Sequence, residues 1–223
     1  MLKNEISNID DFFESLKEIS LNKQKWIFRG VKSCAYKLIP TIGRCKTKKD
    51  IVFTIDKEKS MLSSFIQKAY PYLNKSLSET EFLAFAQHYG LPTRLLDWTR
   101  NPLVAFYFAV KDEWDDDSMI YIWRNESTMY FNTDFDPFKI EEVKFLIPQH
   151  INNRIISQTG LFTVHPNPNV PYESDQIERI VIKNCIRAEM KNILSNMGIN
   201  QASMFPGLNG IADHVKWART NIY

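Results

Sequence analysis

The densest group of functional side chains lies in the segment QHYGLPTRLLDWTRNP, residues 87–102. Glycine and proline interrupt this segment, so we expect a short connection between rigid elements, where binding and catalytic residues are commonly presented. Its candidate site residues are Gln87, His88, Thr93, Arg94, Asp97, Thr99, Arg100 and Asn101. A further candidate is Arg29 in WIFRG, the only charge in an aromatic and aliphatic run, which we place at the end of a strand.

Two interpretations of these residues stay open. Arginine suits phosphate binding, because its planar guanidinium donates two parallel hydrogen bonds and keeps its charge. Alternatively, Arg94 or Arg29 could pair with Asp97 as a buried polar tie between two elements. His88 could act as a general base or simply donate a hydrogen bond to a backbone carbonyl.

The sequence lacks the motifs that are typical of several kinds of binding and active site. The four histidines, His88, His150, His165 and His214, are scattered without HExxH spacing, so we expect no metal site. The sequence contains neither a phosphate-binding GxxxxGK[ST] loop nor a GxGxxG after a strand, and it has no serine-nucleophile elbow. A nuclease acting through Asp97 and His88 would need divalent-metal ligands that this spacing does not display.

Composition indicates a folded chain of ordinary globular type. Hydrophobic residues make up 44% of the 223 residues and charged residues 24%, which predicts one domain over residues 1–223. The net charge of +2 does not by itself imply a nucleic-acid or membrane partner, and no apolar run reaches about 18 residues. The odd set Cys34, Cys45 and Cys185 and a polar N-terminus favour a cytoplasmic location.

The elements expected around the candidates mix helices and strands, so we predict an α+β fold with a mixed or antiparallel sheet and flanking helices. Apolar spacing predicts helices over residues 9–19, 50–72, 79–90, 101–110, 186–197 and 210–219. Strands are expected in the runs KWIFRG, SMIYIWR, KFLIP, RIISQTGLFTVHP and IERIVIKN.

The sequence resembles the FRG domain family, which is named for a Phe-Arg-Gly motif. The resemblance rests on WIFRG, AYKLIPTIGR and FAQHYGLPTRLLDWTRNPLVAFYFAV, and it extends to ISQTGLF and GINQASMFPGLNGIADHVKW. These motifs cover most of the chain in the expected order. The family is widespread in bacteria and phages, so the resemblance implies a toxin or anti-phage role in bacterial conflict.

A second, weaker resemblance is to arginine-class ADP-ribosyltransferases. FRG, then DWTRNPLVAFYFA, then SMIYIW follow the order of that family's arginine strand, hydroxyl residue, helix and next strand. The resemblance implies that Arg29 holds the phosphates of NAD, with Thr99 near the nicotinamide ribose. The remaining binding candidates are Gly30, Gln87, Thr93, Arg94 and Asn101.

The same resemblance implies a catalytic glutamate before a hydrophobic strand, where this chain has ISQTGLFTV. Gln158 stands at that position, and an amide supplies no negative charge for a developing oxocarbenium ion. The catalytic candidates are therefore Arg29, Thr99, Gln158, Asp97 and His88, with Glu142 and Glu173 as further acids. We expect a nucleotide such as NAD as substrate and an unidentified protein or nucleic acid as acceptor, or a non-catalytic recognition module that retains the arginine pocket.

Overall fold

The computed structural model describes residues 3–21, 26–45, 53–73, 77–124, 135–148 and 153–220. Within this part of the chain, strands from both ends join one mixed sheet in the order β1-β7-β4-β2-β3-β6-β5. The strands are β1 (Glu5–Ile6), β2 (Trp26–Val31), β3 (Leu95–Thr99), β4 (Ser118–Arg124), β5 (Lys144–Leu146), β6 (Gly160–Val164) and β7 (Ile177–Ile182). Only β1 and β7 run parallel, and the other neighbouring strands are antiparallel. The fold class is α+β, as predicted.

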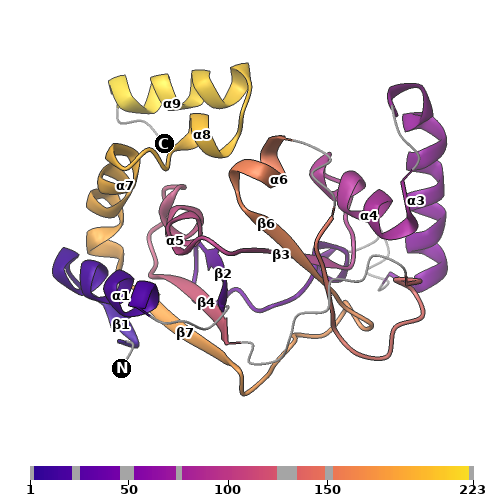
Figure 1. Ribbon diagram of the computed structural model, residues 1–223, viewed down its shortest axis with the longest axis horizontal. Coiled ribbons are helices and arrows are strands. Elements are labelled where there is room, and N and C mark those ends of the chain that lie inside the picture. The colour runs from indigo at the N-terminus through magenta and orange to yellow at the C-terminus, as the bar shows by residue number, and fades with distance from the viewer. Residues whose placement is uncertain are drawn as a thin grey trace.

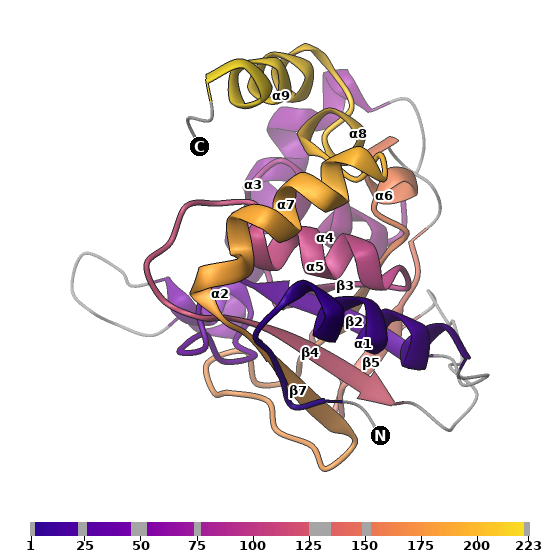
Figure 2. The ribbon, with the colours of Figure 1, turned by 90° about the vertical axis from the view of Figure 1, so that its left-hand side faces the viewer.

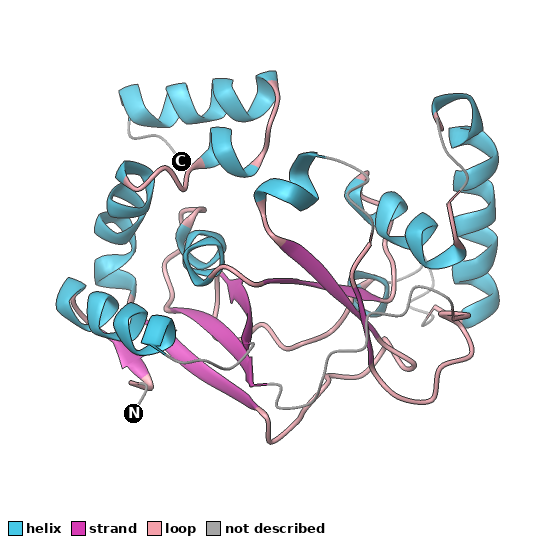
Figure 3. Ribbon diagram, viewed as in Figure 1, coloured by secondary structure: helices cyan, strands magenta, loops and turns pink. Residues whose placement is uncertain are grey.

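Helices alternate with these strands along the chain, and most of them lie on one side of the sheet (Figures 1 and 3). They are α1 (Ile9–Leu21), α2 (Thr41–Arg44), α3 (Ile55–Ala69), α4 (Glu79–His88), α5 (Pro102–Val110), α6 (Asn153–Ser157), α7 (Arg187–Asn196), α8 (Gln201–Met204) and α9 (Leu208–Thr220), with 3-10 turns at Tyr70–Tyr72 and Asn184–Ile186. Figure 2 shows α5 between the sheet and α7, with α8 and α9 farther out.

Strand alternation gives the sheet two faces with different cores. Trp26 and Phe28 of β2 pack with α1, α5 and α7, whereas Ile27 and Val31 belong to a core on the opposite face. A third core packs α3 and α4 against β3, β5 and β6. The central helix α5 is apolar on all sides, as its sequence PLVAFYFAV requires for a helix enclosed by other elements.

Gly30 brings β2 unusually close to α5. A Cβ atom at this position would lie 1.8 Å from the Ala105 carbonyl oxygen and 2.7 Å from the Ala109 nitrogen. Both neighbours are helix backbone, which cannot move aside cheaply, so only glycine fits. Gly30 therefore sets how closely α5 lies against β2.

Three sequence predictions need correction. Residues 95–99, expected in a connection, form the interior strand β3, because Leu96 and Trp98 pack on one face of the sheet while Leu95 packs on the other. The strand expected from residue 154 begins only at Gly160, since residues 153–157 form α6. The helix expected from residue 50 begins at Ile55, where the Thr54 side chain caps it; residues 50–52 lie outside the described residues.

None of the helices in the described ranges has the length and apolar character needed to cross a membrane.

Candidate functional site

The site forms where β2 and β3 separate. These strands are paired at one position only, Phe28 opposite Thr99. Beyond it, the Arg29 side chain bridges the strands: Nη1 donates to the Asp97 carbonyl oxygen at 2.6 Å and lies 3.6 Å from the Asp97 carboxylate. Strand alternation directs the Arg29 side chain away from the α5 face. Where the two strands separate, however, Arg29 still lines a pocket that also includes Ala105 of α5.

This pocket, the Arg29 pocket, has a volume of about 170 Å³. It is lined by Phe28, Arg29, Gly30, Asp97, Trp98, Thr99, Val104, Ala105, Phe108, Arg154 and Gln158. The apolar residues come from β2, β3 and α5, and the polar ones face them from β2, β3 and the α6 region. A hollow with apolar walls and a few convergent polar groups is the usual form of a ligand site.

Two guanidinium groups and one carboxylate set the charge of the described lining. Burial lowers the pKa of both Arg29 and Arg154, and the Asp97 carboxylate partly offsets this in each case. Arg154 also lies over the Phe205 ring, 4.6 Å from its centroid. Two partly desolvated cations beside a single carboxylate favour an incoming anion.

Sequence reasoning missed Arg154. We assigned this residue to the beginning of a strand, whereas it lies on α6, which turns it toward the pocket. An isolated arginine before an apolar pair carries no local signal of a binding role. Only the tertiary position of α6 brings it near Asp97.

A chain of hydrogen bonds fixes the Asp97 carboxylate. Gln87 Nε2 donates to Asp97 Oδ1 at 2.8 Å, and Oε1 of the same side chain accepts from the hydroxyl of Thr93, which is fully buried. The same hydroxyl accepts from the Leu95 nitrogen at 3.1 Å. Gln87 and Thr93 therefore do not line the pocket; they orient the carboxylate that meets Arg29.

A second set of bonds joins β3 to the turn after α6 beside the pocket. The Thr99 hydroxyl donates to the Gln158 carbonyl oxygen at 2.6 Å and accepts from the Asn101 nitrogen at 3.0 Å. Gln158 Nε2 donates to the Met204 carbonyl oxygen at 3.0 Å. The Asn101 side chain caps α5 by accepting from the Leu103 nitrogen. Thr99 and Gln158 line the pocket, whereas Asn101 begins the helix beside it.

Arg94 lies apart from this site. Its side chain is 1% exposed and bonds the buried Glu58 carboxylate through Nε at 3.1 Å and Nη2 at 2.8 Å, while Nη1 donates to the Pro137 carbonyl oxygen. The guanidinium also lies 4.5 Å from the centroid of the Phe138 ring. The structural interpretation therefore holds for Arg94, with Glu58 rather than Asp97 as its partner, and Arg94 cannot reach a ligand in the Arg29 pocket.

His88 lies at the end of α4, outside the pocket lining. It is partly buried and its ring contacts Tyr89 edge to face, with centroids 4.8 Å apart. Burial, and secondarily the Arg154 charge, lowers its pKa, which favours the neutral imidazole. Among the residues that the structure describes, no three histidine, cysteine or acidic side chains gather as metal ligands.

Comparison with known proteins identifies a family for one part of this chain. No curated protein and no solved structure matches the sequence. A family model described as FRG domain matches residues 24–118, a range that includes Arg29 and the whole segment from Gln87 to Asn101 but neither Arg154 nor Gln158. The predicted resemblance to the FRG domain is thereby confirmed over residues 24–118.

Proposed function

We propose that the Arg29 pocket binds the phosphates of a nucleotide, with NAD as the first candidate. The observation that carries this proposal is the meeting of Arg29 and Arg154 in one apolar-walled hollow with Asp97 as the single carboxylate of the described lining. Each guanidinium can donate two parallel hydrogen bonds to phosphate oxygens. Burial strengthens these bonds, because little water competes with them.

The size of the pocket predicts weak binding. About 170 Å³ is below the roughly 300–1,000 Å³ typical of sites that enclose a drug-sized ligand. A dinucleotide would therefore place only one part of itself inside, with the rest lying along the surface. We expect a dissociation constant between about 0.1 and 1 mM, corresponding to about 4–5.5 kcal/mol.

The proposed reaction is cleavage of the bond between the nicotinamide nitrogen and the ribose carbon. The bonding electron pair leaves with nicotinamide, and water or a nucleophile of an acceptor adds to the ribose carbon and loses a proton. The cationic transition state needs a negative charge nearby. Gln158 supplies none, and Glu142 and Glu173 are not among the lining residues, so Asp97 takes this role. Turnover is expected to be slow.

A non-catalytic recognition module is the second candidate, and it draws support from the bonding of Thr99 and Gln158. Both side chains already donate to backbone carbonyls, Gln158 and Met204 respectively. Side chains committed in this way hold β3, the α6 turn and α8 together. In such a module, the Arg29 pocket would bind the nucleotide without cleaving it.

The test is calorimetry with NAD on wild type, Arg29→Lys and the control Arg219→Lys, which changes an exposed arginine of α9 outside the pocket. Lysine keeps the charge but loses the paired donors, so Arg29→Lys should weaken binding about tenfold or more. The control should bind as wild type does. Undetectable binding of NAD to wild type at millimolar concentration would refute the nucleotide proposal. Measuring the release of nicotinamide from NAD then distinguishes an enzyme from a non-catalytic recognition module.

A further inference from the structure

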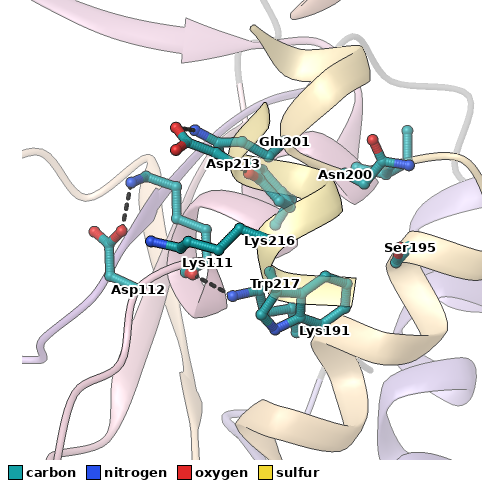
Figure 4. A pocket seen from close by; sticks show the side chains of 11 residues that line it. Lys111, Asp112, Lys191, Ser195, Asn200, Gln201, Asp213, Lys216 and Trp217 are labelled. Atoms are coloured by element: carbon teal, nitrogen blue, oxygen red, sulfur yellow. Dashed lines mark hydrogen bonds and ion pairs between the residues drawn. The ribbon is translucent and has the colours of Figure 1, made fainter. Parts of the chain in front are cut away.

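A second pocket, the lysine pocket, lies at the C-terminal end of α5, where α7, α8 and α9 meet (Figure 4). Its volume is about 200 Å³, and it shares no lining residue with the Arg29 pocket. The residues that matter for its chemistry are Lys111, Lys191, Lys216, Asp112, Asp213 and Trp217. They come from the residues directly after α5, from α7 and from α9, which are distant in sequence, so the site exists only in the folded chain.

The lysines concentrate positive charge on one side of this pocket. Figure 4 shows the ammonium groups of Lys111, Lys191 and Lys216 on the side where Asp112 lies. Lys111 pairs with Asp112 at 2.6 Å, which neutralises one lysine and one acid. The other acid, Asp213, accepts from Gln201 Nε2 at 3.5 Å.

Lys191 is the buried cation of the group. It is 8% exposed, and its ammonium donates to the Lys111 carbonyl oxygen at 2.8 Å while lying 4.7 Å from the centroid of the Trp217 ring. Burial is the main cause that lowers its pKa to about 8. An anion in the pocket would offset this desolvation and stabilise the protonated amine.

Trp217 gives the pocket an aromatic wall. The indole is partly exposed, and Lys216 and Trp217 of α9 both line the pocket, so a bound molecule can contact both side chains. Across the pocket, the Tyr107 hydroxyl bonds the Gln201 side chain, which fixes that wall. An aromatic face beside ammonium groups suits a ligand that carries both a planar ring and an anionic group.

We propose that the lysine pocket binds a small molecule in which a phosphate or a carboxylate group is attached to a planar ring. The ammonium groups of Lys191 and Lys216 receive the anion, and the ring packs against Trp217. This site is independent of the Arg29 pocket and of the nucleotide proposed there.

Lys191 also holds α7 to the end of α5 through the Lys111 carbonyl, so its removal would disturb the fold as well as the pocket. The test therefore uses the exposed Lys216 and the partly exposed Trp217. Lys216→Gln and Trp217→Ala are compared with Lys17→Gln, which removes an exposed lysine of α1 away from the pocket. A melting temperature for each variant confirms that the fold is retained.

Binding of phenyl phosphate, benzoate and neutral benzyl alcohol is measured by calorimetry and by NMR shifts of the indole N–H groups. At least one of the two anions should bind at millimolar or lower concentration, and benzyl alcohol should bind at least tenfold more weakly. The tighter anion identifies the group that the pocket prefers. Lys216→Gln and Trp217→Ala should each weaken that anion about fivefold, whereas Lys17→Gln and Arg29→Lys should not.

Three results would overturn the proposal. Equal binding of benzyl alcohol and the anions would show that charge has no role. Equal weakening by Lys216→Gln and Lys17→Gln would reveal general attraction to a basic surface. Weakening by Arg29→Lys alone would locate the anion in the Arg29 pocket, and that result would leave the proposed function of the Arg29 pocket standing.

Discussion

Two of the arginine–carboxylate pairs in the described residues each include one residue of the short segment from Arg94 to Asp97, and the two pairs differ in what surrounds them. Arg94 and Glu58 are 1% and 3% exposed, whereas Arg29 and Asp97 are 17% and 65% exposed. Backbone and aromatic partners complete the bonding of Arg94, at Pro137 and Phe138. Arg29 borders a pocket that a second arginine, Arg154, also lines.

The difference shows that an arginine in a polar motif has no fixed role. A buried guanidinium enclosed by its partners stabilises the contact between two elements, since removing one partner leaves an uncompensated charge. A guanidinium at the edge of a hollow can instead exchange water for a ligand. The comparison therefore predicts that stability and ligand binding separate between the two pairs.

Loss of Arg94 should produce the largest effect on stability. Arg94→Met leaves the Glu58 carboxylate buried without its cation, and the free energy of unfolding should fall by about 3–5 kcal/mol. Urea denaturation followed by circular dichroism measures this loss. In the double variant Arg94→Met/Glu58→Met, much of the stability should return, because no charge remains buried. A loss below 1 kcal/mol in the single variant would show that this pair is not the tie described above.

A carboxylate at position 158 should have the next largest effect, on the rate of nicotinamide release. It tests whether the Arg29 pocket is catalytic. Gln158→Glu places a negative charge in the Arg29 pocket, where the proposed reaction develops a cation. A group placed in this way can contribute roughly 3–4 kcal/mol, by analogy with the loss of one oxyanion-hole donor, so nicotinamide release should rise about a hundred- to thousandfold. Fast release by the wild type would mean that the catalytic acid is already present elsewhere. Unchanged release in the variant, with NAD still bound, would favour the recognition module.

Low pH should destabilise the fold because His165 becomes protonated. This histidine lies on the same face of the sheet as the Cβ of Arg29, opposite the face that packs against α5. This histidine is 2% exposed, and burial, with a smaller effect of Arg29, lowers its pKa from 6.5 to about 4. Between these values the unfolded chain binds the proton and the folded chain does not, so stability falls as the pH drops from 6.5 to 4. The loss attributable to His165 is about 3 kcal/mol.

Urea denaturation at pH 7 and at pH 4.5 checks this prediction. His165→Gln should show a smaller loss between the two pH values than the wild type, because glutamine does not titrate. An identical loss in both proteins would assign the acid sensitivity to other groups, such as the carboxylates of Asp11, Asp117 and Asp136, whose pKa values are lowered by hydrogen bonds.

Removal of the Gln87 amide should have the smallest effect of this series. Gln87→Leu breaks the bond to Asp97 and leaves the buried Thr93 hydroxyl without that acceptor, which costs about 1 kcal/mol of stability. NAD binding should weaken by a fewfold, since Asp97 is no longer held beside Arg29. Gln67→Leu, on an exposed position of α3, is the matched control for thermal unfolding and calorimetry. Equal behaviour of the two variants would remove Gln87 from the site.

Much of the fold could be predicted from local patterns, because capping residues and apolar spacing mark helix ends. Ser78 caps α4 with the reciprocal Glu81 bond, and Pro102 follows the Asn101 cap of α5. The strand β3 was missed because Leu95 and Leu96 are adjacent and buried on opposite faces, which hides the alternation of a half-exposed strand. Interior strands of this kind resemble other short apolar runs.

The residues of the candidate site likewise include some that the sequence indicated and some that it could not. The sequence brought attention to Arg29, Asp97 and Thr99, whose neighbours in the motif are polar. It could not separate Arg94 from Arg29, because the decisive partner Glu58 lies 36 positions away on α3. Arg154 could not be predicted as a site residue because its neighbour Asp97 is also distant in sequence. The packing of α6 against β6 brings Arg154 to the pocket that Asp97 lines.

The most direct test of the central claim is a crystal structure of the chain soaked with NAD. The account predicts density for the diphosphate within hydrogen-bonding distance of the Arg29 guanidinium, with Arg154 on its other side and the Arg94–Glu58 pair unchanged. Density confined to the lysine pocket, or an Arg29 pocket without diphosphate density at saturating NAD, would contradict it.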